Sequence, residues 1–264
     1  KAYSAIDRVR VDPRHAPDPE IARQLGYLST FGRGMYPLIM RSYHAFATAA
    51  PAEADNARRD LIALLERVQS LLLRRTIVGT STDSPCRARA EGAEALEYAF
   101  ARIMPSDERV RGALKYGALP HPAYVLGRLA GANNLVDLEV AHIFPLAPAD
   151  TWSGDGTTVW ADYSDDAQNS HRALAQTLGN LVLLEEHLAE RAIDASFVEK
   201  RDALFAKSEI APTRDITERD AWGTAAIAAR TVALTEGFLA IWPRPDAGGI
   251  DDDGPTPLLD AKRR

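Results

Sequence analysis

The chain has 264 residues, 46% of them hydrophobic, and a formal net charge of −6 at pH 7. This length and composition are typical of a globular protein with one or two domains. The negative charge argues against a protein that coats nucleic acid non-specifically, because Lys and Arg contacts to phosphate supply most of such affinity, although a local site stays possible. A single cysteine, Cys86, excludes an internal disulfide and the paired-cysteine zinc knuckles.

The first residues carry no secretory signal, and no run of about 18 apolar residues is present. We therefore expect a cytoplasmic protein without a membrane partner. The chain starts at Lys1, and a helical pattern follows almost at once. This start indicates the C-terminal part of a longer protein.

Residues 1–131 read as a helical region. Asp18 is followed by proline and resembles a helix N-cap, and Pro37 opens a second helix in the same way. Residues 57–75 place leucines and Val68 at three- and four-residue steps, which predicts a helix with one apolar stripe.

The period changes to two over residues 135–143. Alternation there predicts a strand with Val140 and His142 on its apolar face and with Glu139 and Ala141 on the other. The central histidine of the segment "EVAHIFP" therefore ends a strand, where it is either a buried structural residue or a base aimed outward.

Residues 157–163 are a possible strand within a long connection, and "NLVLLEE" from Asn180 is a short apolar strand. Residues 187–207 resume a helical pattern. A capping box at Thr217 predicts the start of the last helix, over 218–242, and Trp222 and Trp242 are expected in the core or an interface.

Two stretches, "EVAHIFP" and "LGNLVLLEEHLAERAIDASFVEK", together with the terminal "AARTVALTEGFLAIWP", resemble the C-terminal region of GmrSD-type and SspE-like modification-dependent restriction endonucleases. The resemblance implies a ββα-metal (HNH) nuclease module. The fold class expected from it is mainly α with a small embedded HNH-like module, an α+β arrangement. The domains would be a helical region at 1–131, an HNH-like nuclease domain with flanking helices at 132–245, and a flexible acidic tail at 246–264.

The resemblance also implies roles for individual residues. His142 would be the general base that deprotonates water, for which a neutral imidazole is suited near pH 7. Asn180 would fix the hairpin loop or orient His142 through bonds from its amide to the backbone. Arg191 and Lys200 would contact DNA phosphates. A divalent metal, Mg²⁺ or else Mn²⁺, would be the cofactor.

Two positions depart from the family pattern. The residue before the histidine is commonly a metal-binding acid but is Ala141 here, and the asparagine or histidine expected nine positions after Asn180 is Ala189. Either other residues hold the metal, or an inactivating substitution is present, or the domain has lost its ion. Among the possible replacements, which are Glu139, Glu186, His187 and Asp194, the sequence favours Asp194. His187 and His171 lie in polar stretches and are expected to face solvent.

The predicted function is a metal-dependent DNA endonuclease that acts as the effector of a phage-defence, modification-dependent restriction system. Its partners would be DNA and an N-terminal nucleotide-hydrolysing domain of the full-length protein. The competing interpretation is a degenerate, non-catalytic HNH module that binds DNA or packs against that N-terminal domain. A helical scaffold with no nucleic-acid role would leave the pattern over 142–200 unexplained.

Overall fold

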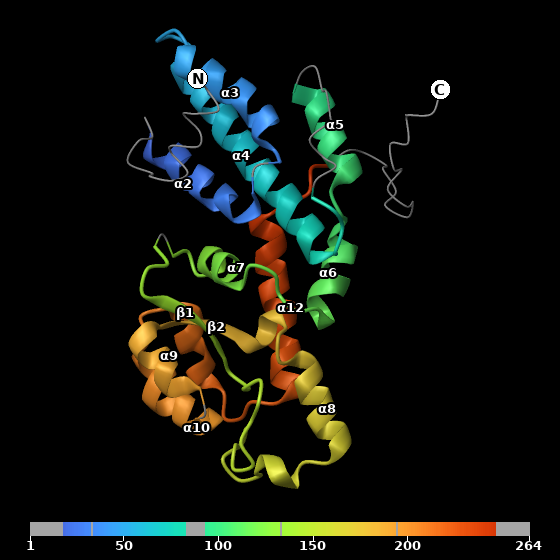
Figure 1. Ribbon diagram of the computed structural model, residues 1–264, viewed down its shortest axis with the longest axis vertical. Helices are drawn as coiled ribbons and strands as arrows, with labels where there is room; N and C mark the ends of the chain where they lie inside the picture. The colour runs from blue at the N-terminus through green and yellow to red at the C-terminus, as the bar shows by residue number, and fades with distance from the viewer. Residues whose placement is uncertain (1–17, 33, 83–92, 133, 194, 247–264) are drawn as a thin grey trace, which may run out of the picture. The chain divides into compact units, whose positions relative to one another are not determined.

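The computed structural model describes residues 18–32, 34–82, 93–132, 134–193 and 195–246. The chain divides into two compact units, one made of residues 1–110 with 242–264 and the other of residues 111–241. Helices dominate both, and the described residues contain one two-stranded sheet (Figure 1). The expected class, mainly α with a small β module, is confirmed. The domain boundaries at 131 and 245 stay a prediction, and nearly all of the predicted tail lies outside the described residues.

Four helices lie wholly within the described part of the first unit. They are α2 (Pro19–Leu28), α3 (Tyr36–Thr48), α4 (Ala54–Ile77) and α5 (Ala93–Ile103). The carboxylate of Asp18 accepts the backbone N–H groups of Glu20 and Ile21, so the predicted N-cap of α2 is confirmed. The apolar stripe of α4 is buried with residues of α2 and α3 in one core.

The arginine pair at the end of α4 has a structural role. Arg74 is fully buried and its guanidinium contacts the Asp107 carboxylate. Arg75 donates to the carbonyl oxygens of Ser81 and Ile103. These contacts tie the end of α4 to the chain that leads into α6 (Asp107–Tyr116), and they leave neither guanidinium facing solvent as a phosphate-binding group would.

The second unit is built around one β-hairpin. Its regular elements are α7 (Pro122–Leu129), β1 (Leu138–His142), α8 (Asp165–Leu174), β2 (Leu181–Glu185), α9 (Glu186–Ala192), α10 (Phe197–Glu199), α11 (Ala211–Arg214) and α12 (Thr224–Ile241). The two strands are antiparallel, with Leu138 opposite Glu185 and His142 opposite Leu181. The strand predicted at 135–143 is thus shorter than expected, because Asp137 adopts a positive φ of 63° that ends the extended backbone.

Both outer edges of the hairpin are covered by side chains. The hydroxyl of Thr213 donates to the Leu183 carbonyl, and the guanidinium of Arg230 donates to the Leu181 carbonyl at 2.8 Å. On the other strand, the ammonium of Lys200 donates to the His142 carbonyl at 2.9 Å. The cross-strand pair of His142 and Leu181 therefore lies between two cationic side chains.

Three predicted elements differ from the structure. Within residues 157–163, Val159 forms a single bridge with Ser153 and Trp160–Asp162 form a 3₁₀ turn. The backbone N–H groups of Thr157 and Thr158 bind the Asp155 carboxylate instead of a neighbouring strand. The helix predicted over 187–207 is interrupted after Ala192 and restarts with a capping box at Ser196. The last helix begins at Thr224, not at 218. Thr217 belongs to a separate 3₁₀ turn, where its hydroxyl bonds to the Arg214 carbonyl instead of capping.

Helix α12 is long and apolar enough to cross a membrane by length and composition alone, with 28% of that window buried. Within its unit, however, it makes specific polar contacts. Its Thr231 hydroxyl accepts the N–H of Gly179 at 3.1 Å, and its Arg230 donates to the Gly179 carbonyl. These bonds attach α12 to the turn that leads into β2.

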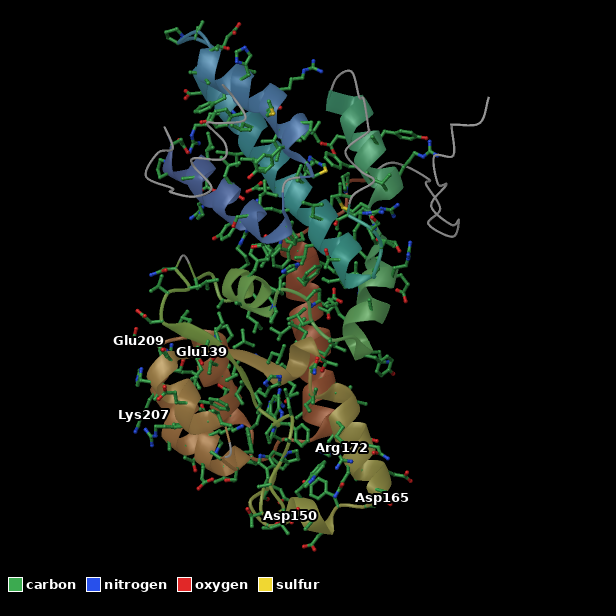
Figure 2. The ribbon with its side chains drawn as sticks, in the orientation of Figure 1. Glu139, Asp150, Asp165, Arg172, Lys207 and Glu209 are labelled. Carbon is green, nitrogen blue, oxygen red and sulfur yellow. The ribbon has the colours of Figure 1, made fainter. Side chains whose placement is uncertain are left out.

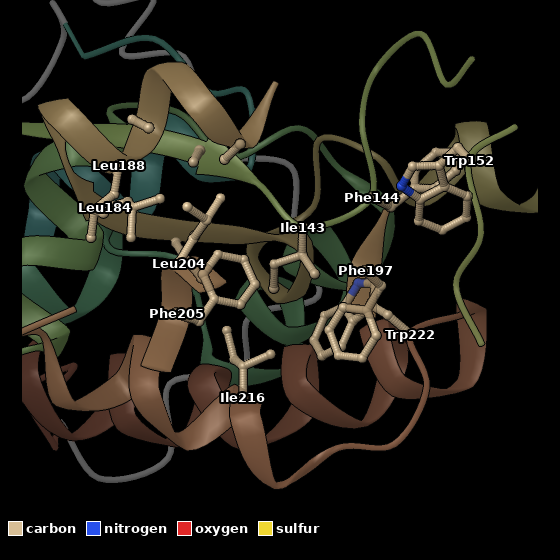
Figure 3. Close-up of a cluster of buried hydrophobic side chains, with 14 of the residues drawn as sticks. Ile143, Phe144, Trp152, Leu184, Leu188, Phe197, Leu204, Phe205, Ile216 and Trp222 are labelled. Carbon is tan, nitrogen blue, oxygen red and sulfur yellow. The ribbon is translucent and has the colours of Figure 1, made fainter. Parts of the chain in front are cut away.

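The core of the second unit is rich in aromatic side chains (Figure 3). Phe144 meets Trp152 edge to face at a centroid distance of 5.0 Å, and Phe197 lies 5.6 Å from Trp222. Trp222 is buried in this core, and Trp242 of the first unit is also buried, which agrees with their expected place in a core or an interface. His171 is buried against Phe144 and Trp160, and the expectation that it faces solvent is wrong. Its Nδ1 contacts the Ala167 carbonyl of its own helix, which a polar sequence context alone does not reveal.

Gly179 offers a test of the contact between α12 and the β2 turn. A Cβ at this position would overlap the Ile227 carbonyl oxygen and the Thr231 hydroxyl. We therefore expect Gly179→Ala to lower the free energy of unfolding by about 1–3 kcal/mol, as overpacking does. Thermal denaturation followed by circular dichroism measures the loss. The control is Gly112→Ala in α6, where an added Cβ meets nothing within 4 Å; equal melting temperatures for the two variants would contradict the packing.

Candidate functional site

His142 is the last residue of β1 and lines a pocket of about 360 Å³. The walls of the pocket come from β1, from the turn after it at Pro145–Ala147, and from α9 with Ile193. Because β1 is an edge of a two-stranded sheet, residues from both of its faces reach the pocket. Glu139 lines it as well as His142, although strand alternation predicts that Glu139 points away.

The imidazole of His142 is half-buried. Burial lowers the pKa of His142 below its usual value, and the positive charge of Lys200 lowers it further. Within the described part of the chain no hydrogen bond holds the ring of His142. A neutral imidazole with open ring nitrogens, facing a pocket, is the state that a general base requires.

The side chain of Asn180 is fully buried and uses its whole hydrogen-bonding capacity. Its Oδ1 accepts the Phe144 N–H at 2.8 Å and the Trp222 indole N–H at 3.1 Å. Its Nδ2 donates to the carbonyls of Phe144 and Ala175, both at 2.8 Å. These four bonds are all that a carboxamide can make.

Asn180 is therefore a positioning residue and does not line the pocket. Its backbone carbonyl accepts the Ile143 N–H, so main chain and side chain together fix the two residues that follow His142. The bonds from amide to backbone are of the kind expected for this position. A direct catalytic contact is excluded by its burial, because water and substrate do not reach it.

The structure contradicts the predicted phosphate contact of Lys200. This side chain has no exposed surface, and its Nζ donates to the carbonyls of His142 and Ile143 at 2.9 and 3.0 Å. An ammonium held in the interior cannot meet a DNA backbone. Arg191, in contrast, is exposed in the last turn of α9, and its phosphate contact stays a prediction.

The two alanines that depart from the family pattern both line the pocket of His142. Ala141 is on β1 and Ala189 faces it from α9, so methyl groups occupy the places of the expected ligands. Among the described residues no group of three or more His, Cys, Asp or Glu side chains could hold a metal ion. Glu186 and His187 are exposed and do not line the pocket, and Asp194 lies outside the described residues. The described side chains thus do not fit a divalent ion by themselves.

Residues 107–236 match the family model of the C-terminal domain of GmrSD restriction endonucleases. These residues are a GmrSD C-terminal domain. The match covers about half of the chain and includes the whole hairpin, the pocket and most of α12. A search of the curated proteins finds no match. The match thus places residues 107–236 in a family of domains from restriction endonucleases.

Two contributors to the site of this GmrSD domain were missed in the sequence. Arg230 supports the strand opposite His142, and burial lowers its pKa to about 10, which still leaves it positively charged at neutral pH. The sequence signal that could have identified Arg230 is its position as a lone arginine within the apolar stretch 224–235. The second is the Trp222 indole that completes the Asn180 network, for which the sequence offers no signal beyond a buried aromatic residue.

The Asn180 network predicts a large effect of a small truncation. Asn180→Ala would leave four buried polar groups without their partner, and we expect a loss of about 2–4 kcal/mol in the free energy of unfolding. Urea denaturation measures it. Asn169→Ala, at an exposed position in α8, is the matched control and should change stability little; similar losses in both variants would refute the central place of the Asn180 side chain.

Proposed function

We propose that this GmrSD domain hydrolyses the DNA backbone with His142 as general base. The observation that supports this most is the position of His142: it ends β1 at a pocket, with a lowered pKa and open ring nitrogens. The imidazole accepts a proton from the attacking water. Lys200 binds the carbonyl of His142, and Asn180 holds the residues that follow it. Arg191, exposed at the end of α9, is the proposed phosphate contact.

A divalent ion, Mg²⁺ or Mn²⁺, is the proposed cofactor, and when bound it would offset negative charge on the scissile phosphate. Glu139 and Glu190 line the pocket, which has alanine at the two usual ligand positions, and no group of the described residues could hold the ion. The ligands would therefore have to come from outside the described residues or from the DNA. The alanines favour, as the second candidate, a non-catalytic module that binds DNA.

The charge distribution supports local contact with DNA and not broad coverage. Exposed charges of both signs lie on the second unit, among them Arg172 and Lys207 beside Asp165 and Glu209 (Figure 2). With a net charge of −6, non-specific affinity should be low and strongly dependent on salt. Selection of modified DNA, and any nucleotide dependence, is proposed to come from an N-terminal nucleotide-hydrolysing domain.

Cleavage of supercoiled plasmid in Mg²⁺, Mn²⁺ or EDTA tests the proposal. We expect metal-dependent nicking that His142→Ala reduces by about 10²–10⁴-fold, the usual contribution of a general base. His187→Ala is the matched control, because this histidine is exposed on α9 away from the pocket. Cleavage that survives in His142→Ala would remove this residue from the mechanism.

Substitution of the two alanines tests whether the pocket of His142 binds a metal ion, without relying on cleavage as the readout. We expect the double variant Ala141→Asp, Ala189→Asn to bind Mn²⁺ more tightly than the natural sequence, because both side chains would enter the pocket of His142. Electron paramagnetic resonance of Mn²⁺ titrations measures free and bound ion. Equal binding by both proteins would show that these positions do not limit the metal site. A natural sequence that neither binds Mn²⁺ nor cleaves, yet shifts labelled DNA, would favour the binding module.

A further inference from the structure

Lys200 is an unusual residue for the interior. A fully buried ammonium is costly unless its charge is compensated, since transfer from water to a protein interior costs several kcal/mol even after relaxation. Here Nζ donates to two consecutive carbonyls, those of His142 and Ile143. Both belong to the end of β1. These two bonds place the ammonium against the backbone of the proposed base and of the residue after it.

The local backbone is arranged to bring Lys200 to this place. Ser196 and Glu199 form a capping box immediately before it, which fixes where the helical segment starts. Residues 200–204 then form a π-helical turn, a wide and rare conformation that occurs frequently at functional sites. A helix that needed only a surface lysine at this position would not require either feature.

The charged groups around His142 come from several elements. Glu139 of β1 and Glu190 of α9 line the same pocket, and Arg230 of α12 binds the carbonyl of Leu181, the cross-strand partner of His142. Arg128 belongs to α7, which also packs on the strands. Of these charges, that of Lys200 is the one that, after burial, lowers the pKa of the imidazole.

We propose that Lys200 is a positioning residue for His142, whose buried ammonium fixes the end of β1 and holds a positive charge beside the imidazole. This role rests on the proposed function of His142 as a base. The proposed role replaces a DNA contact by an internal one: the bonds from Lys200 hold the backbone at His142 in a constant place, and its charge adds to the effect of burial in favouring the neutral imidazole. A shift of about 1 Å in a reacting group can reduce a rate by about 10²-fold.

The first test compares two variants that each remove one cation bound to the same strand pair, Lys200 at His142 and Arg230 at Leu181. In Lys200→Met, we expect the pKa of His142, measured by NMR of its ring, to rise toward the usual value. The acid limb of the cleavage profile should move to higher pH with it, because the base then becomes protonated at higher pH. Arg230→Met removes the cation from the Leu181 carbonyl and should reduce stability without moving the pKa of His142.

The second test uses the natural sequence and does not depend on whether Lys200→Met folds. In protein labelled with ¹⁵N-lysine, the protected ammonium of Lys200 should show an inflection at the pH where the His142 ring titrates. The inflection should be lost in His142→Ala. A ¹⁵N shift that stays constant through the titration of His142 would overturn the proposal, and so would an unchanged pKa of His142 in a folded Lys200→Met protein.

These readouts separate the two proposals. The NMR titrations require no cleavage, so a coupled Lys200 and His142 in a protein that does not cut DNA would remove the nuclease function and leave the link between the residues. Cleavage that depends on His142, with no coupling to Lys200, would retain the nuclease and reduce Lys200 to a folding role.

Discussion

The carboxamide of Asn180 is the point on which the second unit depends. It joins the turn after β1, the end of α8 and the Trp222 indole before α12, three segments far apart in the sequence. Because every donor and acceptor of the group is used inside the protein, its geometry permits little alternative packing. The place of His142 follows from this, since the two residues after it are held by Asn180.

Lys200 and Arg230 extend the same principle from neutral to charged groups. Each is a long cationic side chain whose head binds backbone carbonyls at the hairpin end instead of facing solvent. On average, charges removed from water in this way add little to stability. Their best-attested role is to specify one arrangement of the chain over its alternatives. In this domain the arrangement is that of a half-buried histidine at the mouth of a pocket lined largely by apolar side chains.

The sequence predicted the two strands on either side of the site better than the contacts that the site residues make. Period-two alternation before His142 and the apolar run after Asn180 were sufficient to place the two strands, and the leucine spacing was sufficient for α4. Residues whose role depends on tertiary contacts were not predictable in this way. Lys200 lies in a polar, helical stretch that reads as surface, and its burial follows from a π-helical turn that no local pattern encodes. His171 was misjudged for the same reason, since the aromatic side chains that enclose it are distant in sequence.

The cationic groups at the hairpin also determine what this sheet can bind through its backbone. A two-stranded sheet has two edges at which another extended chain could pair. At the His142 and Leu181 pair, the outward carbonyl of one strand is bound by Lys200 and that of the other by Arg230, while Thr213 binds the Leu183 carbonyl. These acceptors are not available to a third strand. The hairpin is therefore protected, at the end that carries His142, against association through its edges. A domain with exposed strand edges would need this protection when many copies are present in a cell.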